Sequence, residues 1–379
     1  MKPALVVVGT RPEAIKLAPL VKELCDRGYW VDVLVTGQHD MGQVLPVLQT
    51  MGIPESLVSF SPYENIEGVT ESIGRLIDSV STEVAMREPG VIIVQGDTAS
   101  TFAGALAGFL RGVPVAHVEA GLRTHDLSHP FPEEGFRQAV ARWAAVHLAP
   151  TEAAADHLRR ENVFHSDYRV TGNTGVDSLR IVSETLGRLT VLDRIVFTLH
   201  RRESWGEGMR AILRNVRRAM DSFPNTEFLI VRHPNPAVGE EVQRHLSNAS
   251  NATVVPPLEY PEMVAALLQS RGILTDSGGL QEEALALGVP TLVMRQRTER
   301  PELLHEGKGA LVGNEGGGIE AGLQRILTEP LPIANVFRST IIGDGFASRR
   351  VVDALEEKNL LSTWHQHAGT NAPATIVVA

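Results

Sequence analysis

The sequence predicts an α/β protein built from two doubly wound, Rossmann-like domains that face a central cleft. Short β-rich runs alternate with longer helical patterns, which is typical of βαβ units on a parallel sheet. The alternation begins again near residue 193, after a stretch rich in Gly, Asn and Thr at 171–179 that is typical of a hinge. The length of 379 residues also exceeds the roughly 250 to 300 residues at which single cores stop growing.

The first series of elements occupies a predicted domain at 1–172, and the second occupies 173–346. In the first domain we expect strands within 4–9, 30–37, 91–97, 113–120 and 145–151, with helices from about Pro12, within 101–110 and within 133–146. In the second we expect strands within 193–200, 225–233, 251–258, 271–277 and 289–295. Residues 347–361 form an amphipathic pattern, which predicts a helix that packs back on the first domain. The tail at 362–379 has no periodicity and is expected to be disordered.

The composition excludes several classes of protein. The net charge of −10 and the pI near 5.7 argue against a nucleic-acid or anionic-membrane surface. The single cysteine, Cys25, excludes an internal disulfide and a multi-cysteine metal site. No apolar run reaches the roughly 18 residues of a spanning helix, and the N-terminus lacks the pattern of a signal peptide. We therefore expect a soluble, cytoplasmic protein.

The first βα turn, GTRPE, predicts an anion site. Pro12 suits the first position of a helix, and Arg11 lies where exposed backbone amides already favour an anion. Arg11 could hold a phosphate through two hydrogen bonds, with Lys16 one turn along. The alternative is an ordinary helix start with a solvated arginine.

The segment TDSGGLQEE predicts a second anion site. Ser277 is expected to cap the following helix, while Gly278 and Gly279 let an anion approach the bare amides. Glu283 lies far enough along that helix to reach a ribose, and Arg300 in TERPE is a further cation for the same phosphate. A plain serine cap and a surface loop charge are the alternative interpretations.

Several acids and one histidine follow apolar runs. Asp97 in QGDT and Glu119 in HVEAGLR are expected at the carboxyl edge of the first sheet, facing a cleft. Glu133 and Glu134 begin a helix, where the macrodipole alone explains carboxylates. Clustered carboxylates can push their pKa values apart and so supply one base and one acid. His200 closes an apolar run beside two arginines, where it could stay neutral or become protonated when a diphosphate binds.

Motifs of other functions are absent from the sequence. No G-x-G-x-x-G follows the first strand, so dinucleotide binding has little support. The P-loop, the H-E-x-x-H zinc motif and the G-x-S-x-G elbow do not occur either. Neither a dinucleotide cofactor nor a metal is indicated.

Eight sequence blocks follow one another in a fixed order: GTRPEAIKLAPL, QGDT, HVEAGLR, FPEE, TGNT, HRRES, TDSGGLQEE and TERPE. Together they resemble the non-hydrolysing UDP-N-acetylglucosamine 2-epimerases, from about residue 2 to residue 313. The resemblance implies the two-lobed GT-B fold, a homodimer, and interconversion of UDP-GlcNAc and UDP-ManNAc without NAD or metal. It also implies that UDP is eliminated across C1 and C2 to give an enzyme-bound 2-acetamidoglucal, and is then added back with a proton delivered to the opposite face of C2.

The resemblance carries site residues over by matching motif. It implies catalytic positions at Asp97, Glu119, Glu133 and His200. It implies nucleotide-sugar positions at Arg11, Lys16, Ser277, Gly278, Gly279, Glu283 and Arg300. Which carboxylate serves which face of C2 stays open.

Two places depart from the family pattern. Met263 stands where the family usually has a phenylalanine beside the uracil, so apolar contact survives while stacking is weaker. In relatives that bind a second substrate molecule as activator, the motif reads like QHRQML. Here Gln38 and His39 are retained, but the cation and amide that follow them are lost. Arg201 and His233 remain as further candidates for that regulatory site, and activation by substrate stays open.

Two alternative functions also stay open. A hydrolysing 2-epimerase would let water capture the intermediate and would release UDP and ManNAc. The fold alone also permits glycosyl transfer from a nucleotide sugar. The set of carboxylates and the HRRES block favour epimerisation over transfer.

Overall fold

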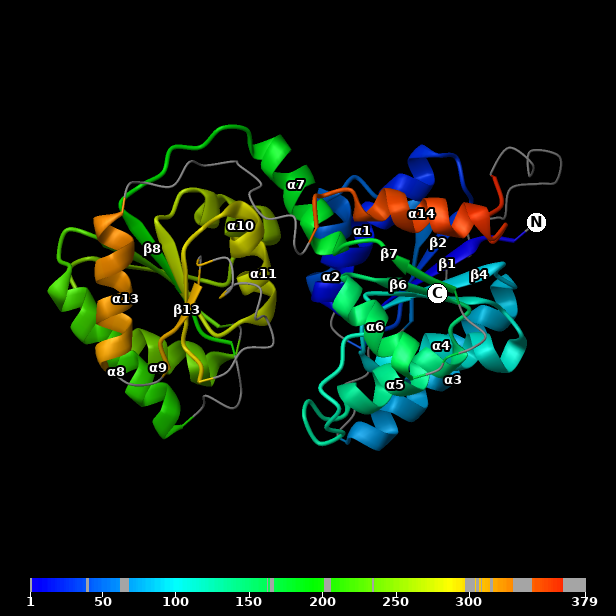
Figure 1. Ribbon diagram of the computed structural model, residues 1–379, viewed down its shortest axis with the longest axis horizontal. Coiled ribbons are helices and arrows are strands. Elements are labelled where there is room, and N and C mark those ends of the chain that lie inside the picture. Colours follow the sequence, from blue (N-terminus) through cyan, green and yellow to red (C-terminus); the bar gives the residue numbers. More distant parts are fainter. Residues whose placement is uncertain are drawn as a thin grey trace. The chain divides into compact units, whose positions relative to one another are not determined.

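The computed structural model of the protein describes residues 2–38, 41–61, 68–161, 163, 167–200, 206–233, 235–296, 304, 307, 309–313, 316–329 and 343–363. Contacts divide the chain into two compact units: unit 1 is Met1–Ser178 with Gly345–Ala379, and unit 2 is Leu179–Asp344. Each unit holds a parallel sheet with helices on both faces (Figure 1). The predicted class, an α/β protein with two doubly wound sheets, is confirmed.

In the described part of unit 1, seven parallel strands form one sheet in the order β3-β2-β1-β4-β5-β6-β7. The strands are β1 Ala4–Val8, β2 Val31–Val35, β3 Val58–Phe60, β4 Val91–Gln95, β5 Val115–Val118, β6 Val146–Ala149 and β7 Asp167–Val170. Strands β1 and β4 are buried along their whole length, because helices cover both faces of a parallel sheet. The winding direction reverses between these two strands, which makes the edge beyond their carboxyl ends the expected place for a binding site.

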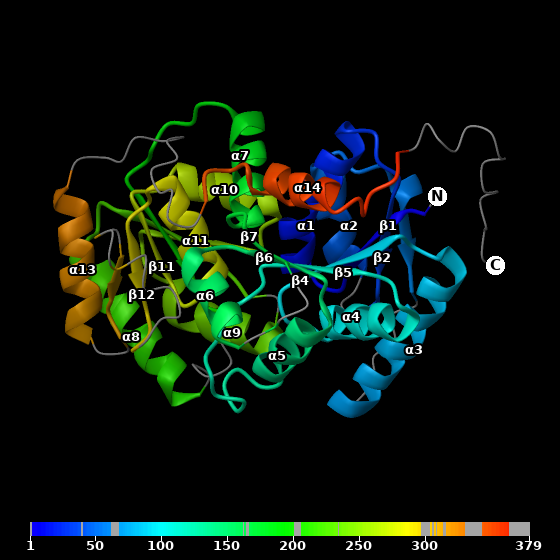
Figure 2. The same ribbon diagram turned by 45° about the vertical axis from the view of Figure 1, so that its right-hand side comes forward.

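The helices of unit 1 cover both faces of this sheet. They are α1 Arg11–Asp26, α2 Met41–Thr50, α3 Val69–Arg87, α4 Ala99–Arg111, α5 Glu133–Trp143, α6 Glu152–Arg160 and α14 Ala347–Glu357, with the short 3-10 helix η1 at Glu55–Leu57. Helix α7, Thr174–Leu186, begins in unit 1 and continues into unit 2. Helices α3, α4 and α5 lie together on one face, and α1 and α14 lie side by side on the other (Figures 1 and 2). Arg27, the residue that follows α1, forms ion pairs with Asp353 and Glu356 of α14 at 2.6 and 3.0 Å.

Unit 2 contains, among its described residues, six parallel strands in the order β10-β9-β8-β11-β12-β13. The strands are β8 Arg194–Thr198, β9 Glu227–Val231, β10 Ala252–Val255, β11 Gly272–Thr275, β12 Thr291–Val293 and β13 Gly309–Leu311. The helices are α8 Glu207–Ser222, α9 Pro236–Leu246, α10 Tyr260–Leu268, α11 Gly278–Leu287 and α13 Gly316–Thr328. Helices α8, α9 and α13 share one face, where their apolar sides meet Phe197 and Phe228 of the sheet.

Strands β3, β7 and β13 lie outside the predicted set. Each is short, lies at a sheet edge and is only partly buried. An edge strand is covered less completely than a central one, so its sequence need not carry a continuous apolar run. This is why apolar patterning misses these three, whereas β10, another edge strand, keeps the apolar run ATVV and is located.

The stretch at 171–179, predicted as the hinge, is helical from Thr174 onward, and the boundary between the two units falls within it, after Ser178. The side chain of Asn173 accepts a hydrogen bond from the amide of Gly175 at 2.8 Å. Asp177 accepts hydrogen bonds from the amides of Ala347 and Ser348, which begin α14. Polar residues that are typical of a loop therefore serve here as helix caps.

The end of the described chain pairs with the beginning of the sheet. The carbonyl of Ser362 accepts a hydrogen bond from the amide of Trp30 at 2.9 Å, and Thr363 forms an antiparallel bridge with Tyr29. These two residues begin the predicted tail. The rest of it, 364–379, lies outside the described residues.

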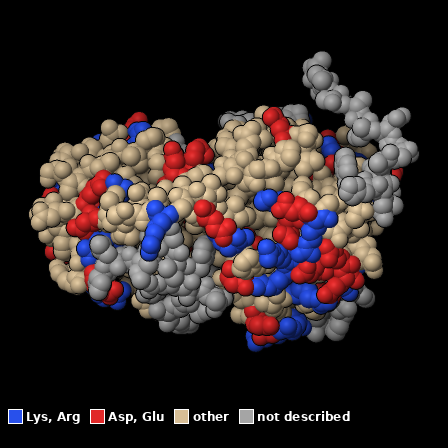
Figure 3. Space-filling view, turned by 90° about the horizontal axis from the view of Figure 1, so that it is seen from above, with Lys and Arg blue, Asp and Glu red and all other residues tan. Residues whose placement is uncertain are grey.

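Charged residues of both signs share the surface. On the face shown in Figure 3, acidic and basic side chains are intermingled, and ion pairs such as Lys22–Asp26 and Arg27–Asp353 run along α1 and α14. In the part of the chain that the structure describes, no helix has the length and apolar character needed to cross a membrane.

Candidate active site

A cavity of about 720 Å³ opens at the carboxyl edge of the sheet of unit 1. Its walls come from the turns that follow β1 and β4, from the residue that follows β5, and from the first turns of α3 and α5. This is the switch point of the sheet, where parallel strands on either side of β1 and β4 send their connections to opposite faces. The topology therefore opens a cavity between loops that lie far apart in the sequence.

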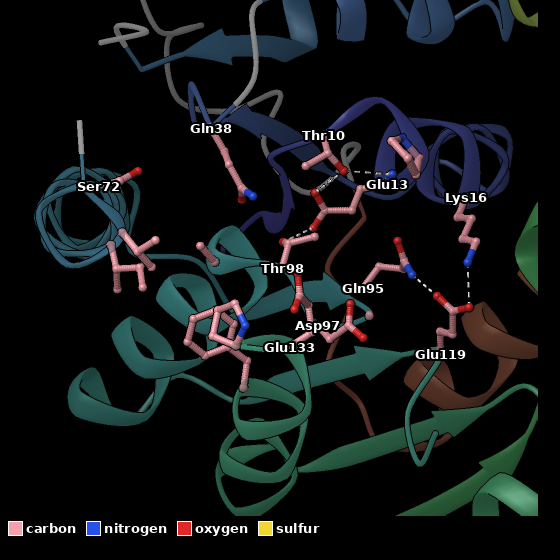
Figure 4. Close-up of a pocket in the computed structure, with 18 residues that line it drawn as sticks. Thr10, Glu13, Lys16, Gln38, Ser72, Gln95, Asp97, Thr98, Glu119 and Glu133 are labelled. Carbon is pink, nitrogen blue, oxygen red and sulfur yellow. Dashed lines mark hydrogen bonds and ion pairs between the residues drawn. The ribbon is translucent and has the colours of Figure 1, made fainter. Parts of the chain in front are cut away.

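Three of the predicted acids line this one cavity. Asp97 follows β4, Glu119 follows β5, and Glu133 is the first residue of α5. Figure 4 shows Asp97 and Glu133 in the middle of the cavity wall, with Glu119 to one side. The structure thus brings together carboxylates that are as much as 36 residues apart in the sequence.

Glu119 is held by two partners. Its carboxylate forms an ion pair with Nζ of Lys16 at 2.6 Å and accepts a hydrogen bond from the side-chain amide of Gln95 (Figure 4). The backbone of Glu119 has a φ of +60°, a conformation that costs a non-glycine residue on the order of 1 kcal/mol and recurs at functional sites. Lys16, predicted from sequence to face a phosphate, therefore contacts an acid of the same cavity.

Asp97 is held by Arg137, a residue that sequence reasoning missed. The guanidinium of Arg137 in α5 donates to the carboxylate of Asp97 and also lies 3.4 Å from Glu134. Arg137 stands four residues after Glu133 on the same helix, so the spacing that puts side chains on one helix face could have indicated it.

Glu133 and Glu134 have different surroundings despite their shared place at the start of α5. Glu133 lines the cavity, whereas the side chain of Glu134 is fully buried. Glu134 accepts hydrogen bonds from the amides of Thr124 and His125, both at 3.1 Å. Although burial alone would raise the pKa of Glu134, these bonds and the one from Gln138 lower it overall. Glu134 thus fixes the loop between β5 and α5, a role beyond the dipole complementarity that its sequence position suggested.

Glu13 is a second cavity residue that was not singled out from sequence. One carboxylate oxygen accepts from the amide of Gly9 at 3.0 Å and the hydroxyl of Thr10 at 2.9 Å. The other accepts from the hydroxyls of Thr98 at 2.7 Å and Thr101 at 3.1 Å. Glu13 therefore joins the turn after β1 to the turn that carries Asp97. The spacing of Thr10 and Glu13 is that of a helix capping box, a signal present in the sequence.

Burial raises the pKa of Glu13 to about 6, against the four hydrogen bonds that favour its carboxylate. Because this value lies above the 4.5 of a free glutamate, the folded protein binds the proton more tightly than the unfolded chain does. Stability from this group is present below about pH 4.5 and is lost as the pH rises through 6. The loss is on the order of 2 kcal/mol.

We expect Glu13→Gln to remove this pH dependence and to keep the fold. The amide oxygen can accept from Gly9, while the amide nitrogen donates to the hydroxyls of Thr98 and Thr101, which can also accept. Melting temperatures measured from pH 4.5 to 7 test this. As the pH rises, the melting temperature of the natural protein should fall relative to that of the variant. If the two melting temperatures instead change in parallel with pH, Glu13 does not titrate in this range.

Gln38, predicted as a candidate regulatory residue, also lines the cavity. Its side-chain oxygen accepts from both the amide and the hydroxyl of Ser100, at 2.9 and 2.6 Å, at the start of α4. A side chain on Gly9 would collide with Ser100 and with Gln38, so the first turn requires glycine at this position. Arg11 begins α1 but is not among the residues that line the cavity.

In unit 2, His200 and His233 meet beyond the ends of β8 and β9. Their rings lie 5.7 Å apart in an edge-to-face arrangement. The amide of His200 donates to the buried carboxylate of Asp276 at 2.7 Å. The structure therefore groups a predicted catalytic histidine with a predicted regulatory one, around an aspartate that follows β11 and that sequence reasoning did not single out.

The predicted anion site at the start of α11 differs in one detail from expectation. Ser277 occupies the N-cap position, as predicted, but its side chain makes no capping hydrogen bond, so its predicted capping role is wrong. Its amide donates instead to the hydroxyl of Thr275, and its carbonyl accepts from Gln281. A Cβ at Gly279 would meet no described atom within 4 Å, so packing does not require a glycine there. Gly278 is the first residue of the helix.

Met263 and Glu283 lie in neighbouring helices of unit 2. Met263 is buried in α10, and Glu283 is in α11. Tyr260, which begins α10, is buried as well, and burial together with the charge of Glu283 raises the pKa of its hydroxyl. The described residues thus place an apolar side chain and a carboxylate on elements that follow β10 and β11.

Three predicted site residues, His39, Arg201 and Arg300, lie outside the described residues. Within the described ranges, no three His, Cys, Asp or Glu side chains are grouped as metal ligands would be. The acids of the cavity meet Lys16, Arg137, amides and hydroxyls instead.

Comparison with known proteins points to one group of enzymes. The family described as UDP-N-acetylglucosamine 2-epimerase matches residues 23–356. The UDP-N-acetylglucosamine 2-epimerase of Escherichia coli (strain K12) is 37% identical over 375 residues, which cover 94% of this chain and 99% of the relative.

Solved structures give the same result. The UDP-GlcNAc 2-epimerase of Neisseria meningitidis, solved with UDP-GlcNAc, superposes with a TM-score of 0.85 at 35% identity and covers 94% of this chain and 100% of its own. The S. aureus MnaA protein, solved with UDP, has a TM-score of 0.83 at 35% identity and covers 95% of this chain and 98% of its own.

Proposed function

Because the chain belongs to the UDP-N-acetylglucosamine 2-epimerase family, we propose that it is an isomerase that reversibly converts UDP-GlcNAc to UDP-ManNAc by removing and returning UDP. One observation supports this proposal most directly. The predicted acids Asp97, Glu119 and Glu133 line a single cavity of unit 1.

Epimerisation at C2 needs groups that take a proton from one face and return one to the other. In the first step a carboxylate takes the C2 proton, the C1–O bond breaks, and its electron pair leaves with UDP while the C–H pair forms the C1=C2 bond. In the reverse sense, a protonated acid delivers hydrogen to the opposite face of C2 as UDP oxygen bonds to C1. More than one carboxylate within a cavity supplies both roles.

The C2 hydrogen is only weakly acidic, so departure of UDP must lead or accompany its removal. Cations and helix amides that bind the diphosphate therefore stabilise the transition state as well as the substrate. We assign this role to Arg11, Lys16 and Arg300, with His200 on the diphosphate side. In unit 2 we assign nucleotide binding to Ser277, Gly278, Gly279, Glu283 and Met263. The space over Gly279 supports close approach of a ligand to that helix start.

Incubation with UDP-GlcNAc in deuterated water, followed by NMR, tests the proposal. UDP-ManNAc that carries deuterium at C2 is the expected product, because the proton returned comes from a group in exchange with solvent. Free ManNAc with UDP would show a hydrolysing 2-epimerase instead. No reaction with UDP-GlcNAc would contradict the proposal and leave glycosyl transfer as the function to test, with acceptor sugars added.

The finer expectations about assembly and location stay predictions. We propose a homodimer, which light scattering on the purified protein tests. We also propose a cytoplasmic location, which fractionation of cells tests.

A further inference from the structure

His117 is a buried side chain that the chemistry above does not use. It lies in β5, two residues before Glu119, and is 1% exposed. Its Nε2 lies 2.7 Å from the carbonyl oxygen of Gly96, the residue that precedes Asp97. Because a carbonyl can only accept, Nε2 carries the proton and Nδ1 carries the lone pair.

The buried imidazole is neutral. Burial lowers the pKa of His117 to about 4, and the charges of Arg123 and Arg137 contribute in the same direction. Among the described residues Nδ1 has no hydrogen-bond partner, and an unsatisfied buried polar atom costs about 1–3 kcal/mol. An apolar side chain would avoid that cost. What an imidazole supplies here, and an apolar ring would not, is the hydrogen bond to Gly96.

That bond fixes the turn that carries Asp97. Gly96 has a φ of +73°, and its amide donates to the carbonyl of Val118 at 3.0 Å. Both polar backbone atoms of Gly96 are therefore bound to β5, the strand that ends just before Glu119. The Gly96 carbonyl and the Asp97 nitrogen belong to one planar peptide. Holding that plane sets the direction in which Asp97 leaves the turn.

We propose that His117 is a positioning residue, whose hydrogen bond to Gly96 fixes the placement of Asp97 relative to Glu119 in the cavity. The inference rests on the proposed function, since it assigns catalytic work to those two acids. Acid and base groups act efficiently only within a narrow range of geometry, and a misplacement of about 1 Å can cost on the order of 10²-fold in rate.

His147 provides a matched control. It lies in β6 directly in register with His117, is equally buried, and has a pKa lowered by burial to about 3. The two rings are 6.3 Å apart. The hydrogen bond of His147, however, goes to the backbone of Ala141 in α5, and its ring stacks on Tyr168. A change at His147 thus disturbs the same core without touching the bond to Gly96.

The test compares His117→Phe, His117→Gln and His147→Phe in the full chain. We expect His117→Phe to lower kcat for UDP-GlcNAc roughly 10- to 100-fold, with KM and the Kd for UDP changed less than about threefold. His117→Gln should restore most of the rate, because its amide nitrogen reaches about where Nε2 lies. His147→Phe should lower the melting temperature about as much as His117→Phe, while kcat stays within about threefold of the natural protein.

Unchanged kcat in His117→Phe, an equal loss in His147→Phe, or failure of His117→Gln to restore the rate would each overturn the inference. NMR of the 15N-labelled protein distinguishes failure of the positioning role of His117 from failure of the proposed function. If the natural protein does not epimerise UDP-GlcNAc, the proposed function fails. The positioning role is then decided by whether His117 shows the neutral Nε2–H form at pH 6 and whether the Asp97 amide signal shifts in His117→Phe but not in His147→Phe. A charged imidazole, the other tautomer or an unmoved Asp97 signal refutes it.

Discussion

Asp97→Asn is expected to lower kcat by about 10²- to 10⁴-fold while UDP still binds. The carboxylate of Asp97 lines the cavity and is held by Arg137. Asparagine keeps the size of the side chain and an oxygen that can accept from Arg137, so the geometry of the turn should survive. It cannot take or return a proton. Rates measured by NMR with UDP-GlcNAc, together with UDP binding by calorimetry, test both halves of the prediction.

A melting curve provides the control for Asp97→Asn. If the variant melts at the same temperature as the natural protein and binds UDP, a loss of rate belongs to the chemistry. Turnover within about threefold of normal would remove Asp97 from the set of acids that move the C2 proton, and Glu119 and Glu133 would remain.

Glu133→Gln and Glu134→Gln should fail in different ways, although the residues are adjacent. Each oxygen of Glu134 faces two donors: one faces the amides of His125 and Gln138, and the other faces the amide of Thr124 and the guanidinium of Arg137. Glutamine has only one accepting oxygen, so its NH₂ group must face one of these pairs of donors and cannot accept from them. We expect Glu134→Gln to destabilise the protein by at least about 2 kcal/mol. That loss corresponds to a fall in melting temperature of roughly 4–8 °C.

Glu133→Gln should leave the melting temperature nearly unchanged, because Glu133 faces the cavity. Its expected effect is a fall in kcat of about 10²-fold or more, as for the loss of an acid or base. Each variant serves as the control for the other, since both remove one charge from the first turn of α5. Equal melting curves for the two variants, or a lowered melting temperature with normal kcat in Glu133→Gln, would contradict the division of roles.

Much of this protein follows from its sequence alone. The apolar runs of the central strands and the helical periods between them predict two parallel sheets, because both patterns are local. Asp97 and Glu119 each come directly after such a run, so parallel topology alone sends both to the same edge of one sheet. The order of the eight blocks indicates the family before any fold is known.

Only the tertiary structure determines which partner each of these side chains meets. Lys16 meets Glu119 rather than solvent, Arg137 meets Asp97, and Glu13 joins Thr10 to Thr98. The tertiary structure also gives the adjacent residues Glu133 and Glu134 different roles, because Glu133 lines the cavity and Glu134 holds a loop. Local sequence patterns indicate which residues are apolar and where a helix or strand begins. A contact between residues that are dozens of positions apart depends on the order of the strands in the sheet and on how the helices pack on it. A single sequence carries no direct signal of which distant residues come into contact.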